Sequence, residues 1–226
     1  MQVAEAVASR RSVRAYLDRP VDPAVLRRVL EQAQWSPSGC NLQPWQAAVL
    51  MGKPLEDLRA LLKDHAFQSQ PEYPITPDPL TDPWRGRYGK VTGARLAAEG
   101  VARDDEAARE ASAARNYEFF GAPALLLCWL PRHMNAPQWS DMGMWLQTIM
   151  LLLRGEGLDS CALESLSRHA RTIKDYLGVS DTENVFFCGM AIGWADPDAA
   201  INQFERQRAP LEESVRFVGF EETTPA

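Results

Sequence analysis

The stretch SPSGCNLQPW, residues 36–45, follows an apolar helical pattern and combines two prolines, a glycine, two hydroxyls, two carboxamides and a tryptophan. The prolines restrict the backbone, the glycine lets another group approach it closely, and the polar side chains offer hydrogen-bond donors and acceptors. This inventory suits the edge of a flat heterocycle and its polyol chain. The alternative is a well-capped loop in which Trp45 only begins the next strand. The candidate binding residues here are Pro37, Ser38, Gly39, Asn41 and Gln43.

The size and charge of the chain limit the classes of function. With 226 residues and 46% hydrophobic content, the chain can bury the core of one α+β domain spanning residues 1–226. A net charge of -6 and a pI near 5.2 exclude a broad nucleic-acid or acidic-membrane surface. The first residues lack a signal-peptide pattern, and the longest apolar run, MGMWLQTIMLLL, is too short and mixed to span a bilayer. We therefore expect a cytoplasmic protein that binds neither membrane nor nucleic acid.

Cysteine and histidine spacing argues against several kinds of chemistry. The four cysteines are scattered with no CxxC pair, and the three histidines have no HExxH spacing, so no metal site is predicted. A Ser-His-Asp triad stays open, although no GxSxG motif supports it. GEGLDS at Gly155 begins like a dinucleotide-binding GxGxxG motif but lacks the third glycine and follows a helical pattern rather than a strand.

Hydrophobic periodicity predicts helices alternating with a few strands around a central sheet. Asp22 as N-cap and Pro23 at the first helical position make the helix at 21–35 the clearest. Further helices are predicted at 54–64, 102–120, 141–157 and 168–179. Strands are predicted at 46–51, 122–130, 184–194 and 214–220, the first two of them buried.

Five prolines between His65 and Tyr88 predict an irregular segment at about 65–88. A loop of this length in a compact domain is usually either functional or disordered. If functional, it is a lid, and an indole with two guanidiniums at its distal end could cover an anionic aromatic substrate. The residues concerned are Trp84, Arg85 and Arg87.

Two arginine clusters lie near opposite ends of the chain. In SRRSVRAY, an extended backbone would place Arg10, Ser12 and Arg14 on one side, which suits a phosphate. In FERQRAP, Arg206 and Arg208 again share one side. Together they predict one anion site assembled from both ends, with a solvated basic turn as the alternative.

GLDSCALESLS, residues 157–167, reads as a polar loop after the buried helix at 141–157. Glu164 and Ser165 lie at its tip. Such a loop could present backbone N–H groups to a ligand that gains negative charge.

RRSVR, SPSGCNLQPW, GLDSCALES and RQRAP occur in an order that resembles the FMN-dependent nitroreductase family over nearly the whole chain, and the long 65–88 segment resembles its nitrobenzoate-reductase-like branch. The resemblance implies a mostly antiparallel central sheet flanked by helices, and an interlocked homodimer with two flavin sites at the interface. It implies that the flavin phosphate and ribityl chain contact Arg10, Ser12, Arg14, Arg206 and Arg208, with Arg11 near the ring. It further implies that Pro37, Ser38 and Asn41 reach across from the partner subunit with Gly39 and Gln43 close by, and that the backbone of Leu163, Glu164 and Ser165 faces the flavin N5 edge.

The implied activity is ping-pong hydride transfer from NADPH or NADH, through FMN, to a nitroaromatic or quinone. Residues that could stack on such a substrate are Phe119, Phe120 and Trp139, each of which could instead belong to the core. Same-fold alternatives are flavin-cleaving and reductive dehalogenating enzymes; Ser12 stands where the flavin-cleaving enzymes typically carry an acidic residue. A flavin-binding redox sensor without turnover is the alternative outside enzymology.

Overall fold

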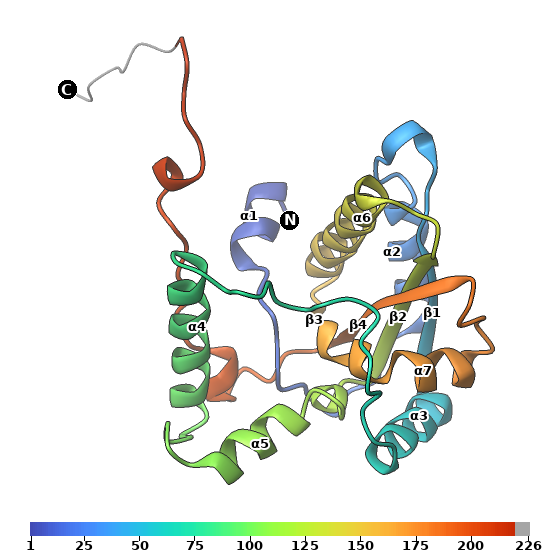
Figure 1. Cartoon of the computed structure of the whole chain (residues 1–226), viewed down its shortest axis with the longest axis horizontal. Helices are drawn as coiled ribbons and strands as arrows, with labels where there is room; N and C mark the ends of the chain where they lie inside the picture. The colour runs from blue at the N-terminus through green and yellow to red at the C-terminus, as the bar shows by residue number, and fades with distance from the viewer. Residues whose placement is uncertain (220–226) are drawn as a thin grey trace.

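A four-stranded antiparallel sheet lies at the centre of the protein (Figure 1). It belongs to a computed structural model that describes residues 1–219. The strand order is β1-β2-β4-β3, with bounds β1 Gln46–Met51, β2 Ala124–Pro131, β3 Asp159–Leu163 and β4 Asn184–Gly193. The expected antiparallel sheet and three of its predicted strands are confirmed.

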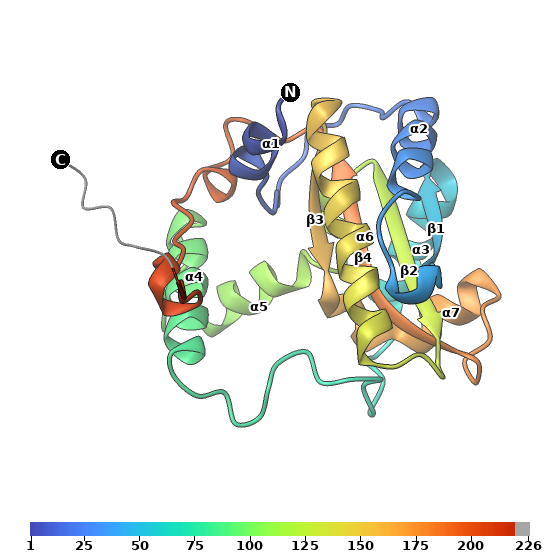
Figure 2. The same cartoon turned by 90° about the horizontal axis from the view of Figure 1, so that it is seen from above.

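Helices cover both faces of the sheet (Figures 1 and 2). Two helices pack on one face, α2 (Pro23–Ala33) and α6 (Ala136–Gly155), while α3 (Gly52–Asp64) and α7 (Ala170–Leu177) cover the other. The predicted cap of α2 is present, because the Asp22 carboxylate accepts a hydrogen bond of 2.8 Å from the Ala24 N–H.

The central strand β2 explains the continuous apolar run in its sequence. Successive side chains of a strand point to opposite faces. Leu125 and Leu127 accordingly join the core cluster beneath α3 and α7, whereas Leu126 and Leu130 join the cluster beneath α2 and α6. Because both faces are covered, the positions on both sides of the strand have to be apolar, which makes the run continuous.

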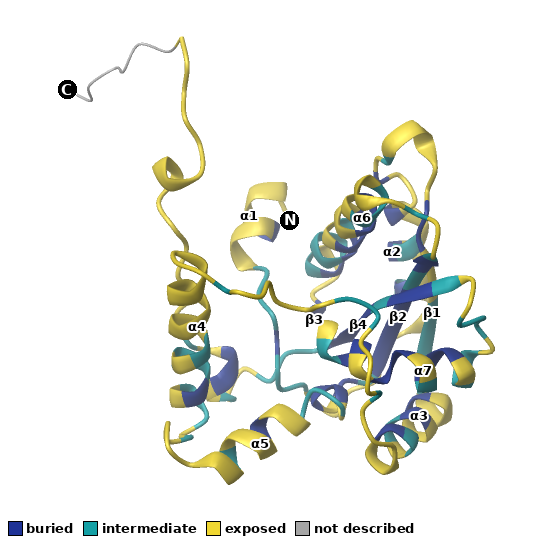
Figure 3. Cartoon of the chain, viewed as in Figure 1, coloured by how far each residue is buried: buried dark blue, intermediate teal, exposed yellow. Residues whose placement is uncertain are grey.

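The remaining helices lie to one side of this layered core. They are α1 (Val3–Ser9), α4 (Trp84–Ala98) and α5 (Glu106–Ala114), and the C-terminal segment runs beside α4 (Figures 1 and 3). The chain exposes 13844 Å², about a third more than the ~10,300 Å² expected for a compact monomer of this mass. The side elements are therefore extended away from the core instead of being folded onto it.

Four predictions about the elements need correction. The strand β1 forms an edge of the sheet, and its residues are partly or fully exposed, so it is not the buried strand expected. Residues 159–163, expected in a loop, pair with β4 as β3. The segment 65–88 ends earlier than predicted, because α4 begins at Trp84. Residues 214–219 form no strand, and Phe220 of the predicted 214–220 strand lies outside the described residues.

Two predicted helices have shifted bounds. The helix at 102–120 is α5 followed by turns and a 3₁₀ helix at Phe119–Gly121, while α6 begins five residues before the predicted start. Within residues 1–219, none of the helices has the length and apolar character that a bilayer span requires.

Candidate functional site

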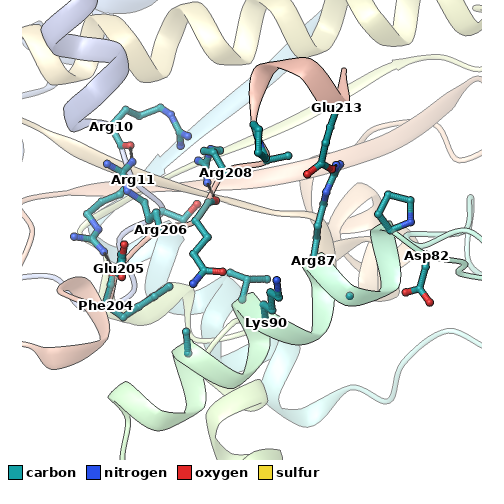
Figure 4. A pocket seen from close by; sticks show the side chains of 18 of the residues that line it. Arg10, Arg11, Asp82, Arg87, Lys90, Phe204, Glu205, Arg206, Arg208 and Glu213 are labelled. Carbon is teal, nitrogen blue, oxygen red and sulfur yellow. Dashed lines mark hydrogen bonds and ion pairs between the residues drawn. The ribbon is translucent and has the colours of Figure 1, made fainter. Parts of the chain in front are cut away.

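A cavity of about 800 Å³ lies between three segments that are distant in the sequence: residues 10–14, residues 204–210 and α4 (Figure 4). Its walls include both predicted arginine clusters, with the intervening hydroxyl: Arg10, Arg11, Ser12, Arg14, Arg206 and Arg208. The structure thus brings the clusters from opposite ends of the chain into one site.

The N-terminal wall of this cavity is held against β3. The Val13 N–H donates to the Ser160 carbonyl at 3.1 Å, and the Val13 side chain is buried in the protein. Since alternate residues of an extended segment point to opposite sides, Ser12 and Arg14 lie on the side opposite the buried Val13 side chain, and both line the cavity.

The buried side chain of Asn202 fixes the same segment from the other end of the chain. Its Oδ1 accepts from the Arg14 N–H at 2.8 Å, and its Nδ2 donates to the Ala15 carbonyl at 2.8 Å and to the Asp196 carbonyl at 3.0 Å. These three hydrogen bonds satisfy the amide oxygen and both amide N–H donors away from water. This amide is a positioning residue of the cavity wall.

The arginines of the cavity carry positive charge with little internal compensation. Arg10 has no carboxylate or side-chain hydrogen-bond partner within residues 1–219. Burial, reinforced by the nearby Arg206 and Arg208 guanidiniums, lowers the pKa of Arg10 below its ordinary value. Among residues 1–219, Arg208 donates only to the carbonyl of its neighbour Gln207, at 2.8 Å. An anion entering the cavity would relieve this repulsion.

Two of the arginines predicted to bind the cofactor have structural roles in this chain. Arg206 donates to the backbone carbonyls of Arg10 and Ala8, and so ties the C-terminal segment to the N-terminal one. Arg11 donates to the Phe204 carbonyl at 2.6 Å and lies over the Phe204 ring at 5.7 Å. Burial, followed by repulsion from Arg206, lowers the pKa of Arg11.

The loop 36–45 lies elsewhere, against the N-terminal half of α6. The Gly39 N–H donates to both carboxylate oxygens of Asp141 at 3.2 Å, and Ser38 Oγ accepts from the Gln43 N–H at 3.0 Å. Cys40, Asn41 and Gln43 adopt left-handed backbone angles, with φ between 48° and 57°. Such angles in non-glycine residues are strained and cluster at functional sites.

The predicted ligands in this loop do not line the arginine cavity of the same chain. Trp45 is buried and stacks on Trp145 at 5.8 Å, so its side chain belongs to the core. The loop can therefore contact a flavin bound at these arginines only if an interaction with another protein surface places it beside the cavity.

Glu164 and Ser165 follow β3 at the start of a 3₁₀ helix, Glu164–His169, and Leu163 before them is buried. Ser165 Oγ is buried and has no hydrogen-bond partner within the described part of the chain. Burial raises the pKa of Glu164. The unpartnered hydroxyl marks a place where a polar ligand edge would complete the hydrogen bonding.

The first half of the proline-rich segment is fixed to the core. Glu72 Oε1 contacts Lys174 Nζ at 2.5 Å and Arg132 Nη2 at 2.8 Å, and Glu72 Oε2 accepts from the Phe186 N–H at 2.7 Å. The neighbouring Tyr73 hydroxyl donates to the Phe187 carbonyl. A lid in this segment can therefore include only the residues after this anchor.

The three residues proposed for the far end of the lid lie in the first turn of α4. Trp84 is exposed, Arg85 pairs with Asp82 at 2.5 Å, and Arg87 pairs with Glu213 at 2.6 Å (Figure 4). Both guanidiniums already have carboxylate partners. This pairing counts against their use as the binding site for a carboxylated substrate.

The three aromatic candidates are divided between core and surface. Phe119 and Phe120 are 0% and 6% exposed in the core cluster on the α3 side, which favours the packing role. Trp139 is half-buried and makes edge-on contacts with Tyr73 at 5.3 Å and Phe187 at 5.5 Å. Of the three, only Trp139 keeps a position from which a ring could reach a ligand.

Sequence analysis missed Asn202, Glu72, Tyr73 and Lys174. Only Lys174 had a local signal, because it shares the apolar face of α7 with Ala170 and Ile173 at helical spacing. The other three make contacts that span more than a hundred residues, or lie in an irregular segment without periodicity.

The chain is similar to known proteins over most of its length. Residues 7–194 match the Nitroreductase family. The chain is 34% identical over 216 residues to a 4-nitrobenzoate reductase of Pseudomonas putida, covering 95% of each protein. These matches place the protein in the nitroreductase family.

Solved structures show the same fold. The FMN- and NADPH-dependent nitroreductase NfnB of Sphingopyxis sp. strain HMH is 45% identical, with a TM-score of 0.93 over 97% of this chain and 100% of that chain. The FMN-dependent NfnB of Mycobacterium smegmatis, solved in complex with NADPH, is 32% identical with a TM-score of 0.89, over 96% and 98% of the two chains. The resemblance stated from the motifs is confirmed.

Proposed function

We propose that this protein is an FMN-dependent oxidoreductase that uses NADPH or NADH to reduce nitroaromatic or quinone-type substrates. The observation that carries the proposal is the cavity formed by two arginine clusters, in which Arg10 lacks any anionic partner within residues 1–219. A cavity of this volume and charge in a member of the nitroreductase family fits a phosphorylated flavin.

The residues present fit FMN on three counts. Arg10, Arg14 and Arg208 supply guanidinium donors for a terminal phosphate. The partly buried Ser12 hydroxyl lies between Arg10 and Arg14 on the same wall, where a polyol can be bound. The buried Ser165 hydroxyl, for which residues 1–219 supply no hydrogen-bond partner, offers a polar contact for a ring edge.

Bound FMN supplies the hydride chemistry, so the chain needs no acid–base constellation of its own. The arginines bind and orient the phosphate end. The backbone around Glu164 and Ser165 would present N–H groups to the ring edge that gains negative charge. Burial raises the pKa of Glu164 above its ordinary value.

We further propose that the site is completed in a homodimer. Large apolar side chains are exposed on α1, on α4 and along the C-terminal segment, among them Val3, Trp84, Leu211, Phe217 and Val218. A groove of about 800 Å³ between α2 and the unpaired edge of β1 is lined by Leu26, Leu30, Val49 and Met51. The partner's residues 214–219, which alternate in sequence like a strand, are the segment we assign to this edge. The partner's loop 36–45 would then supply the missing ring contacts.

The phosphate assignment is tested by replacing Arg14 and Arg208 with alanine together. Each charge-assisted contact contributes roughly 1.5–3 kcal/mol, so the double variant should purify largely colourless while the wild type releases FMN, and no FAD, on denaturation. Lys53→Ala, at an exposed pair with Asp57 far from the cavity, is the control. Full flavin occupancy in the double variant would overturn the assignment.

Turnover and assembly have separate tests. Anaerobic NADPH should bleach the flavin, and nitrobenzoates, nitrobenzene and quinones should reoxidise it; a flavin that stays oxidised would indicate a sensor instead. Light scattering should give a dimer of about twice 25.3 kDa. A monomer that binds FMN tightly would rule out a shared site. Because reduced dinucleotide is a metabolite of the cytoplasm, we also propose that the protein acts there.

A further inference from the structure

The cavity contains more positive charge than one phosphate requires. Seven cationic side chains and three carboxylates line it, an excess of four positive charges. A phosphate monoester carries about 1.5–2 negative charges at neutral pH. After one such group binds, roughly two positive charges remain without a counterion.

Part of this excess is on α4, away from the arginine clusters. Two cations of α4 face the cavity, but Arg87 is paired with Glu213 at 2.6 Å (Figure 4). Lys90 has no carboxylate or hydrogen-bond partner within residues 1–219 and points towards the region of Arg208 (Figure 4). Lys90 is therefore the uncompensated cation of this wall.

The helix face around Lys90 has room for a ligand. Gly86, Lys90 and Ala94 line the cavity at a spacing of four residues, so the lysine stands between two of the smallest side chains on one face of α4. The exposed Val91 lies next to them on the same wall and offers apolar surface to a base. A compact ammonium beside open space and a small apolar surface suits a second phosphate on a nucleoside.

We propose that Lys90 binds the 2′-phosphate of NADPH, so that α4 determines the preference for the phosphorylated over the unphosphorylated dinucleotide. This inference rests on the proposed function and names the residue that recognises one of its substrates. The pyrophosphate cannot provide that preference, because both dinucleotides contain it. The 2′-phosphate monoester of NADPH adds about two negative charges that NADH lacks.

The test compares Lys90→Gln, Lys90→Arg and the surface control Lys53→Gln as purified flavoproteins. Calorimetry would measure binding of adenosine 2′,5′-bisphosphate and of adenosine 5′-monophosphate, and steady-state kinetics would give the ratio of kcat/KM for NADPH to that for NADH. Lys90→Gln should weaken the bisphosphate at least tenfold and leave the monophosphate unchanged. The NADPH/NADH ratio should fall by a similar factor, through KM, while Lys90→Arg and Lys53→Gln keep wild-type values.

Three results would overturn the inference. The first is a wild-type protein that binds the two nucleotides equally well. The second is an equal loss of affinity for both nucleotides in Lys90→Gln. The third is loss of FMN from Lys90→Gln, which would place Lys90 at the cofactor phosphate. Absence of turnover with either dinucleotide in the wild type would instead contradict the proposed function, and the calorimetry would still decide the role of Lys90.

Discussion

Replacing Lys174 with methionine should destabilise the protein by about 3 kcal/mol. The Lys174 side chain is 0% exposed, and its Nζ contacts Glu72 at 2.5 Å, Asp181 at 2.5 Å and the Asn184 carbonyl at 3.1 Å. Removing one partner of a buried ion pair typically costs 3–5 kcal/mol, because the other charge stays buried. Here the lower end applies, since Glu72 keeps Arg132 at 2.8 Å and the Phe186 N–H at 2.7 Å.

A loss of about 3 kcal/mol corresponds to a drop in melting temperature of roughly 6–12 °C for a chain of this size. Urea unfolding of wild type, Lys174→Met, Glu72→Gln and the double variant would form a double-mutant cycle, and the double variant should lose less than the sum of the single ones. Because Glu72 lies in the proline-rich segment, both single variants should also be cleaved faster between residues 74 and 83 by a protease.

The matched control is Lys53→Met, whose pair with Asp57 is on the surface, with side chains 80% and 47% exposed. Its unfolding midpoint should stay at the wild-type value. A Lys174→Met midpoint as close to wild type as that of Lys53→Met would refute the reasoning, as would additive effects in the cycle.

Three further predictions concern pH, hydride transfer and substrate charge. The hydrogen bond from Lys174 lowers the pKa of Asp181 below its ordinary value of 3.8. The stability that this carboxylate contributes is therefore present above pH 3.8 and lost as the pH falls through its folded-state pKa. The Asp181→Asn variant should melt at a lower temperature than wild type at pH 7, and at the same temperature as wild type in strong acid. The Ser165→Pro substitution removes a backbone N–H and fixes φ, so it should abolish flavin reduction by NADPH in anaerobic stopped flow. Glu164→Gln and Ser165→Ala should keep much of that reduction rate. An unimpaired Ser165→Pro enzyme would place the flavin ring edge elsewhere. Because Arg85 and Arg87 already pair with carboxylates, replacing both with alanine should change KM equally for 4-nitrobenzoate and nitrobenzene, and a selective rise for the benzoate would restore them to substrate binding.

The elements that neighbouring residues determine, through capping, a fixed φ or an apolar run, were predictable from the sequence. Asp22 and Pro23 begin α2 through a cap and a fixed φ, and the apolar run of β2 follows from coverage on both faces. In contrast, α4 contains three glycines and follows two prolines within five residues. Each glycine weakens helix propensity by about 1 kcal/mol, so only tertiary context accounts for this helix.

Pairing over long distances limited the remaining predictions. Asp159 and Ser160 look like loop residues, but they are the start of β3 because β4 provides its hydrogen bonds. Residues 214–219 alternate like a strand, yet within residues 1–219 they do not form one. One site assembled from both arginine clusters was predictable, because crowding like charges costs free energy unless an anion neutralises them. The contact of Asn202 left no pattern in the sequence, because its partner Arg14 is 188 residues away.

The bond from Arg206 to the carbonyl of Arg10 joins residues that are 196 positions apart, and this separation has a consequence for biosynthesis. A ribosome adds about 5–20 residues per second, so the N-terminal wall of the cavity exists for roughly 10–40 s before Arg206 is made. During that interval β1 and β2, which pair with each other, can already come together, since β2 ends at Pro131, well before Arg206. The β1–β2 pair is thus available for folding on the nascent chain, while β4 and the C-terminal wall of the cavity are completed only at the final stage of translation.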